Sequence, residues 1–227
     1  MAEEFDALTG DPNLSNKLEA YFSDVAEKGD LAQAFGLLPA QAVIQKTLEF
    51  RAFHPLVWSL HGIILDDPNT SDHHVMLCVA GVRGAVMHLC HDGTTRIVFK
   101  CTNSFLEAVG RAADEGGFVE DEHPTMAWVA DEQDGLQDLI SSLRNHVDYD
   151  DIGPALVPSL NLKNVEFLAN LVEQDSVYVA EAVCREIEIR PAEHLMPVLE
   201  RAGVHHHWMV RNASIRARAK IDGLRNI

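Results

Sequence analysis

The sequence has few basic residues, and this shortage excludes several classes of partner. Its 227 residues contain 18 Lys and Arg against 35 Asp and Glu, which gives a formal net charge of −17. Nonspecific binding to nucleic acid or to an anionic membrane needs Lys and Arg side chains that neutralise phosphates. The composition therefore predicts no nucleic-acid or membrane partner. It suits solubility and a basic protein partner.

Long apolar runs and closely spaced cysteines are also missing. No apolar run approaches the roughly 20 residues that span a bilayer. Residues 1–4 carry acid where a signal peptide would carry positive charge. The four cysteines include no CxxC pair and are typical of reduced, mostly buried thiols. We therefore expect a cytoplasmic protein, and 47% apolar residues suffice for a full core in one large or two small domains.

Signatures of catalysis are absent as well. The sequence has no GxSxG, and the glycines of residues 81–84 lack the strand and helix that flank a phosphate-binding loop. Asp66 and Asp67 could act as a general acid and base, but carboxylates before Pro-Asn more often form turns and caps. We therefore expect a protein that is not an enzyme, with no catalytic residue and no cofactor.

What the sequence does contain is a run of short strands between residues 57 and 99. Each segment is apolar or β-branched and is bounded by turn residues, with Asp92-Gly93 as the strongest turn. Such short connections permit only antiparallel pairing. The pattern predicts an antiparallel meander with the strands Val57–Leu65, His73–Val79, Ala85–Leu89 and Thr95–Phe99. A helix should follow, with Ser104 and Glu107 forming a capping box.

The flanking segments predict helices. Residues 1–12 have the composition of a loose acidic start, and helices are expected at residues 15–28, 31–36 and 39–45. Glycines and Pro124 in residues 116–125 indicate a linker. The fold class is therefore α+β, an antiparallel meander sheet with flanking helices followed by an all-α domain. The domains are predicted at residues 1–120 and 126–227.

The all-α domain contains a faint internal repeat. Leu171-Val172-Glu173 matches Val198-Leu199-Glu200 at an offset of 27 residues, and at the same offset Val177 matches Val204 and Val183 matches Val210. The expected helices cover residues 134–147, 162–173, 177–187, 191–201 and 204–221. The repeat predicts two stacked helical hairpins, as in HEAT-like arrays.

Residues 15–113 resemble the SMI1/KNR4 (SUKH) superfamily. The resemblance depends on Leu38-Pro39 ahead of the sheet, on the segment 62–71 (GIILDDPNTS), and on the segment 84–93 (GAVMHLCHDG), which continues into Ile97-Val98-Phe99 and Ser104-Phe105-Leu106. This chain departs from the pattern in lacking a Gly-Gly or Asn-Gly turn after Leu38-Pro39. The resemblance implies an α+β binding scaffold without catalytic residues, whose members include immunity proteins against toxins and cellular regulators. A shared fold does not by itself fix function.

Histidines and cysteines crowd the sheet region. The residues concerned are His73, His74, His88, His91, Cys78, Cys90 and Asp92. Imidazole, thiolate and carboxylate groups could bind zinc if three or four of them converged. No standard zinc spacing is present. We therefore expect the histidines to lie on the polar face of the sheet, the cysteines to be buried, and no metal to be bound. His205-His206-His207 is expected at a helix start or on the surface, because consecutive helical residues point 100° apart.

The stretch from residue 114 to 151 is strongly acidic. It holds twelve Asp and Glu residues and one Arg. It could be a solvated linker and helix face, or a docking surface that steers a basic partner. The candidate partner-binding residues are Glu120, Asp121, Glu122, Asp66, Asp67 and Asp92.

Three functions remain open from the sequence. The first is a cytoplasmic protein-binding module, such as an immunity protein that neutralises a basic toxin domain. The second is a helical-repeat adaptor, with the sheet domain as its anchor. The third is a metal-dependent enzyme that uses the His/Cys cluster. The partner and the oligomeric state do not follow from the sequence.

Overall fold

The computed structural model describes residues 2–173 and 176–224. The chain divides into two compact units, residues 1–128 and 129–227. The first unit contains α1 (Ala2–Thr9), α2 (Pro12–Lys28), α3 (Asp30–Ala34), α4 (Ala40–Arg51), α5 (Pro55–Ser59), β1 (Ile63–Ile64), β2 (His73–Met76), β3 (Val86–Leu89), β4 (Arg96–Phe99), α6 (Thr102–Glu115) and the 3-10 turn η1 (Val119–Glu122). Among the helices in the described residues, none has both the length and the apolar character needed to cross a membrane.

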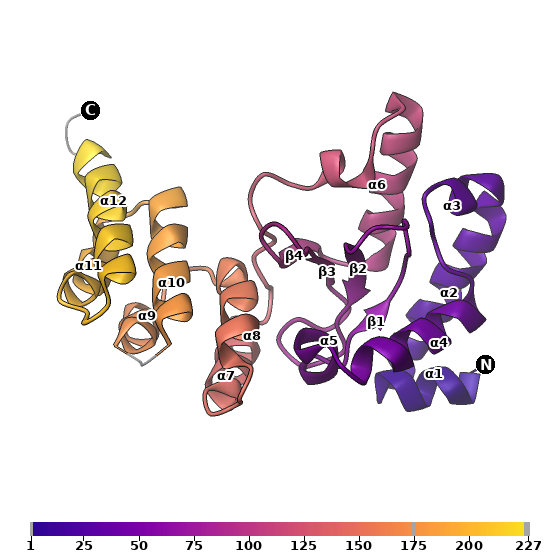
Figure 1. The fold of residues 1–227 in the computed structure, drawn as a ribbon, viewed down its shortest axis with the longest axis horizontal. Helices are drawn as coiled ribbons and strands as arrows, with labels where there is room; N and C mark the ends of the chain where they lie inside the picture. Colours follow the sequence, from indigo (N-terminus) through magenta and orange to yellow (C-terminus); the bar gives the residue numbers. More distant parts are fainter. Residues whose placement is uncertain (1, 174–175, 225–227) are drawn as a thin grey trace. The chain divides into compact units, whose positions relative to one another are not determined.

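The sheet is the four-stranded antiparallel meander that the sequence predicts (Figure 1). Neighbouring strands pair in chain order, and β2 pairs with β3 so that His74 lies opposite His88 and Met76 opposite Val86. Residues on one strand that are two apart share a face of the sheet. His74, Met76, Val86 and His88 therefore share one face, apolar at one end and polar at the other.

The first predicted strand is wrong in its first half. Val57 and the residues around it form the short helix α5, and only Ile63 and Ile64 pair with β2. Pro55 occupies the start of α5, where its fixed φ suits a helix and its missing N–H costs nothing. His61 then takes a left-handed conformation with φ 47°, which turns the chain into β1.

The expectation of a loose N-terminus is also wrong. Residues 2–9 form α1, in which Phe5 is 1% exposed and stacks on Phe22 of α2 with ring centroids 5.1 Å apart. The carboxylate of Asp11 caps α2 by accepting from Asn13 N–H at 2.8 Å. The acidic character of this segment reflects its solvent face, while Phe5 and Leu8 face the core.

Helix α6 closes the core of the first unit. Its buried residues, among them Phe105 and Val109, join a cluster with residues of α1, α2, α4 and the sheet. The predicted cap is shifted, because Cys101 is the N-cap and Ser104 is the third helical residue. The Ser104 hydroxyl accepts from Cys101 N–H at 3.3 Å. Helix α6 therefore begins with a capping box, but between Cys101 and Ser104 and one turn earlier than predicted.

The segment 116–125 contains ordered structure that belongs to the first unit. Val119 of η1 is 6% exposed, and Arg111 of α6 donates from Nε to Glu122 Oε2 at 2.6 Å. Trp128 N–H donates to Ile97 O at 3.4 Å, so the first unit extends past the predicted linker.

The second unit is entirely helical in its described residues. Its elements are α7 (Gln133–Leu143), α8 (Tyr149–Leu156), η2 (Val157–Ser159), α9 (Val165–Val172), α10 (Val177–Ile189), η3 (Glu193–Leu195), α11 (Met196–Gly203) and α12 (Trp208–Leu224).

Within that unit, α9 packs on α11, and α10 packs on both α8 and α12 (Figure 1). This is the predicted pair of stacked helical hairpins. The matched residues Leu171, Val198, Val183 and Val210 are buried, whereas Val204, which the repeat matches with Val177, is 85% exposed. Three helices were predicted to begin too early, because α9 starts at Val165, α11 at Met196 and α12 only at Trp208. Helix α8 was not predicted from the sequence.

Candidate functional site

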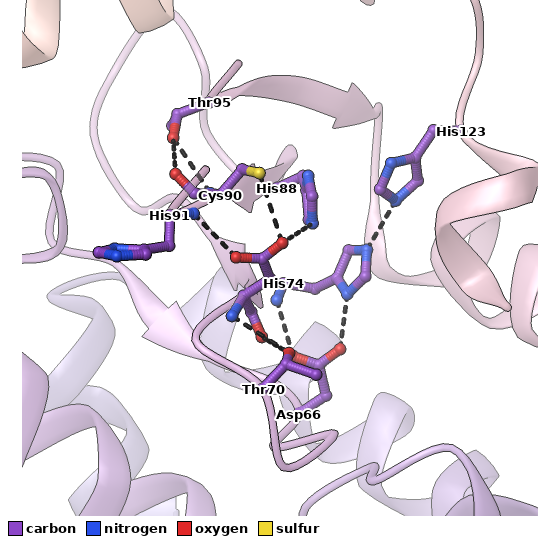
Figure 2. Close-up of polar contacts among 9 residues, drawn as sticks. Asp66, Thr70, His74, His88, Cys90, His91, Thr95 and His123 are labelled. Atoms are coloured by element: carbon purple, nitrogen blue, oxygen red, sulfur yellow. Dashed lines mark hydrogen bonds and ion pairs between the residues drawn. The ribbon is translucent and has the colours of Figure 1, made fainter. Parts of the chain in front are cut away.

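One end of the sheet carries a concentration of polar side chains. Asp72, His74, His88 and Cys90 alternate along β2 and β3 and their extensions, so they lie on one face of the sheet. Asp66 follows β1, and His123 comes from the end of η1 (Figure 2). We call these six residues the polar cluster: Asp66, Asp72, His74, His88, Cys90 and His123.

A buried hydrogen-bonded chain forms the first half of the polar cluster. The His74 side chain is 2% exposed, its Nδ1 lies 2.5 Å from Asp66 Oδ2, and its backbone N–H donates to Asp66 Oδ1 at 2.7 Å. His74 Nε2 lies 2.8 Å from His123 Nε2, and a dashed line in Figure 2 marks this hydrogen bond. The carboxylate of Asp66 can only accept, so His74 Nδ1–H donates to it. When both rings are neutral, His123 Nε2–H donates to His74.

His123 ends this series of hydrogen bonds, and it was not among the candidate residues that the sequence suggested. Burial is the largest cause that lowers the pKa of His123, and together with His74, His88 and Arg96 it brings this pKa to about 3. The ring is therefore neutral at physiological pH. Its ring centroid lies 4.6 Å from that of His88 and 5.6 Å from that of Phe99. No local pattern near residue 123 points to β2, and only the packing of η1 on α6 brings this ring over the sheet.

His88 occupies the centre of the polar cluster with one ring nitrogen unpartnered. Its side chain is 10% exposed, and its Nε2 is buried without a hydrogen-bond partner among the described residues. The closest acceptor is Asp72 Oδ2 at 3.8 Å, which is too far for a hydrogen bond. Burial lowers the pKa of His88, as does the neighbouring His74, while Asp72 acts in the opposite direction. The imidazole is therefore neutral.

Asp72 and Cys90 form the second half of the polar cluster. Asp72 Oδ1 accepts from His91 N–H at 2.8 Å, and Asp72 Oδ2 accepts from the Cys90 thiol at 3.3 Å. Burial alone would raise the pKa of Asp72, but these hydrogen bonds outweigh it and the pKa is lowered. Burial and the bond to Asp72 raise the pKa of Cys90, whereas the N–H groups of Asp92 and Gly93 favour its thiolate.

The loop after β3 shapes the space around the Cys90 sulfur. Thr95 Oγ1 accepts from Cys90 N–H at 3.1 Å and donates to Cys90 O at 3.3 Å, which closes the loop on itself. Gly93 does not have the positive φ expected of a tight hairpin turn. A Cβ at Gly93 would instead lie 2.8 Å from Cys90 Sγ, so the glycine leaves room for the thiol.

The other predicted His/Cys candidates do not converge on this place. His73 faces the opposite side of the sheet, where its ring meets Phe50 of α4 edge-on at 4.8 Å. The His91 ring is 72% exposed and points away from His88 and Cys90 in Figure 2. Burial raises the pKa of Cys78 to about 12, so that thiol is a neutral core residue.

The six candidate partner-binding residues differ in their solvent exposure and in their ion pairs. Glu120 and Asp121 are exposed on η1, and Glu122 is half-buried against Arg111. Asp92 is 97% exposed, and its Oδ1 lies 3.8 Å from His91 Nε2. Asp67 pairs with Lys46 at 2.7 Å, and Asp66 is 2% exposed inside the polar cluster. Asp66 therefore has no surface from which to contact a partner in this structure.

The three histidines before α12 have a structural role. His205 Nδ1 accepts from His207 N–H at 3.0 Å, and His207 Nδ1 accepts from Met209 N–H at 3.4 Å. These bonds satisfy backbone donors at the start of a helix, as a cap does. The prediction of a helix-start cluster is confirmed.

The geometry of the polar cluster allows proton exchange along Asp66, His74 and His123, and ligation at Asp72, His88 and Cys90. The described residues place no serine or lysine in hydrogen-bond contact with His74 or His123, so no activated nucleophile completes the chain. Comparison of this chain with protein-family models, with curated proteins and with solved structures gives no match. Its function must therefore be argued from its own residues.

Proposed function

We propose that the chain is a non-enzymatic protein-binding module whose first unit docks a basic partner on an acidic surface around Phe118. The observation that carries this proposal is the exposure of Phe118. Its side chain is 74% exposed, although it is a large apolar group in an ordered turn. Aromatic side chains of this kind supply most of the binding energy in many interfaces.

The turn holds Phe118 in place from several sides. Phe118 N–H donates to Asp121 Oδ2 at 3.0 Å, the next residue Val119 is buried, and Glu122 pairs with Arg111 at 2.6 Å. A side chain on such a turn loses little conformational freedom when it binds, which favours affinity. Phe118 is thus presented to solvent by a preformed structure.

The charge around Phe118 indicates the chemistry of the partner. Asp114, Glu115, Glu120 and Asp121 are exposed and have no ion-pair partner in the part of the chain that the structure describes. Exposed acids around an aromatic contact steer a basic partner and exclude acidic ones. The resemblance to SMI1/KNR4 proteins supports a toxin as that partner, with this chain as its immunity protein.

The stacked hairpins of the second unit favour a second candidate, a helical-repeat adaptor. In such arrays each hairpin packs on its neighbours and leaves an extended surface for binding. Trp208 is 60% exposed and Tyr178 is 54% exposed in the second unit. An adaptor would bind through these residues and not through Phe118.

The test compares two matched variants in partner capture and in binding kinetics. The full chain is immobilised and exposed to lysate, and captured proteins are compared for wild type, Phe118→Ala and Trp208→Ala. We expect a basic protein that is captured by wild type and by Trp208→Ala and is lost with Phe118→Ala. The same protein captured by Phe118→Ala but lost with Trp208→Ala would favour the adaptor.

The charge contribution is then measured with that protein. Glu115→Gln with Glu120→Gln removes two acids beside Phe118 without touching the Asp121 cap or the Glu122 bridge. We expect slower association with little change in dissociation, and a weaker dependence on salt. The control, Glu19→Gln with Glu200→Gln, removes the same charge from exposed positions elsewhere. Equal effects of both pairs would show that net charge, and not this surface, steers the partner.

A further inference from the structure

We propose that Asp72, His88 and Cys90 form a binding site for a divalent transition metal ion, with zinc as the best match to the three ligands. The ligand atoms are Asp72 Oδ2, His88 Nε2 and Cys90 Sγ. They all lie within 4.8 Å of one another. This inference is independent of the acidic surface around Phe118.

The distances between the ligand atoms fit a zinc ion. Zinc binds nitrogen, oxygen and sulfur ligands at roughly 2.0–2.3 Å, so two ligands of a tetrahedral site lie about 3.3–3.8 Å apart. Asp72 Oδ2 lies 3.8 Å from His88 Nε2 and 3.3 Å from Cys90 Sγ. The third pair, His88 Nε2 and Cys90 Sγ, lies within 4.8 Å.

The buried nitrogen of His88 points independently to a ligand. A buried polar atom without a hydrogen-bond partner destabilises the folded state, so most such atoms in folded proteins have a partner. His88 Nε2 is such an atom, and it lies on the edge of the ring that faces the Asp72 carboxylate, as the dashed line in Figure 2 marks. A bound metal ion would satisfy it.

The surroundings hold the ligands in the orientation that a metal needs. Asp72 Oδ1 is fixed by His91 N–H, which leaves Oδ2 directed at the site. Thr95 fixes the backbone of Cys90 through two hydrogen bonds. Gly93 keeps the space beside Sγ open. Supporting contacts of this kind typically change metal affinity by about 10–100-fold.

The ligand types select the class of metal. Magnesium and calcium prefer oxygen ligands, whereas thiolate together with imidazole suits zinc and its neighbours in the first transition row. Three protein ligands leave the fourth position of a tetrahedral zinc ion open to water. Asp72 is 28% exposed, so solvent can reach this side of the site.

His88 and Cys90 were among the zinc candidates in the sequence, but Asp72 was not, because the three ligands are not spaced like those of a zinc motif. Asp72 precedes β2, while His88 and Cys90 lie in and after β3. They meet only because β2 and β3 pair with His74 opposite His88, which places Asp72 beside Cys90. Asp92, which the sequence suggested, is almost fully exposed.

The test uses cobalt as a spectroscopic substitute for zinc in the purified full chain. Thiolate bound to cobalt gives a charge-transfer band, and tetrahedral coordination gives strong visible bands. We expect both bands at one cobalt per chain, and we expect zinc to abolish them by displacement. Zinc should also slow the alkylation of Cys90 by iodoacetamide without affecting Cys101.

Variants connect these signals to the proposed ligands. Cys90→Ser should remove the charge-transfer band. Asp72→Asn and His88→Gln should each weaken zinc binding by more than about 10-fold, the least that the loss of a supporting contact costs. Cys101→Ser and His91→Gln are the matched controls and should leave both the band and the affinity unchanged. If circular dichroism shows that His88→Gln does not fold, the result depends on Cys90→Ser and Asp72→Asn.

Two results would overturn the proposal. The first is the absence of stoichiometric cobalt and zinc binding by the folded wild-type chain. The second is binding that survives Cys90→Ser and is lost when His206 and His207 are both changed to Gln, which would place the metal at the histidines before α12.

Discussion

Substituting Gly93 tests the packing of the polar cluster directly. A Cβ at this position would lie 2.8 Å from Cys90 Sγ, whereas ordinary contacts begin at 3.4 Å. The sulfur cannot move away freely, because its hydrogen bond to Asp72 and the two Thr95 bonds fix the residue. Overpacking of this kind costs about 1–3 kcal/mol, so we expect Gly93→Ala to destabilise the first unit by that amount.

The structure also predicts how this cost can be relieved. In Cys90→Ala the sulfur is gone, and the nearest atom to the new methyl group is the Cβ of residue 90 at 4.0 Å. Cys90→Ala alone should cost about 0.5–1.5 kcal/mol through the lost hydrogen bond to Asp72. Adding Gly93→Ala to it should then cost less than about 0.5 kcal/mol, which corresponds to a coupling energy of at least about 0.5 kcal/mol.

The assay must report on the first unit alone. Of the three tryptophans, Trp58 and Trp128 lie in the first unit and Trp208 in the second. In a Trp208→Phe background, urea unfolding followed by tryptophan fluorescence therefore reports the first unit, and a chelator excludes any effect of metal. If the two substitutions proved additive, steric conflict with the sulfur could not be the reason for glycine at position 93.

Three further outcomes are expected from other parts of the chain. The Lys46 hydrogen bond is the largest cause that lowers the pKa of Asp67, so the contribution of this pair is full above the unfolded pKa and disappears as pH falls through the lower, folded pKa. Lys46→Gln should therefore lower stability by about 0.5 kcal/mol in urea titrations at neutral pH, and by less at about pH 3. Phe5→Ala should cost about 3–5 kcal/mol in urea unfolding because Phe5 is 1% exposed, whereas Val147→Ala, at a residue 90% exposed, should cost less than about 0.5; equal costs would place α1 outside the core. Burial raises the pKa of Cys184 to about 12, so mass spectrometry should find this thiol unalkylated by iodoacetamide in the folded chain and modified only after denaturation.

The sequence predictions failed where the same short sequence is compatible with two different conformations. Pro55 excludes helix for the residue before it and equally favours a helix after it, and the structure takes the second option in α5. The acids of residues 2–9 fit a disordered start, yet Phe5 and Leu8 supply the spacing of an amphipathic helix. In both places the burial of a few apolar side chains in the core decides the outcome, and that core does not exist until distant segments meet.

The sequence by itself determined the antiparallel meander and the stacked hairpins. Alternating apolar residues, turn residues and a repeat of 27 positions are properties of short segments, and the pairing of adjacent strands follows from the length of the connections between them. The tertiary structure alone decided the polar cluster. Its six residues come from four segments: Asp66 after β1, Asp72 and His74 at β2, His88 and Cys90 at β3, and His123 after η1. They converge through the register of β2 on β3 and the packing of η1 on α6. A change of register by one residue would send His74 and Asp72 to the opposite face, so local spacing suggested His74, His88 and Cys90 but could not bring Asp72 and His123 to them.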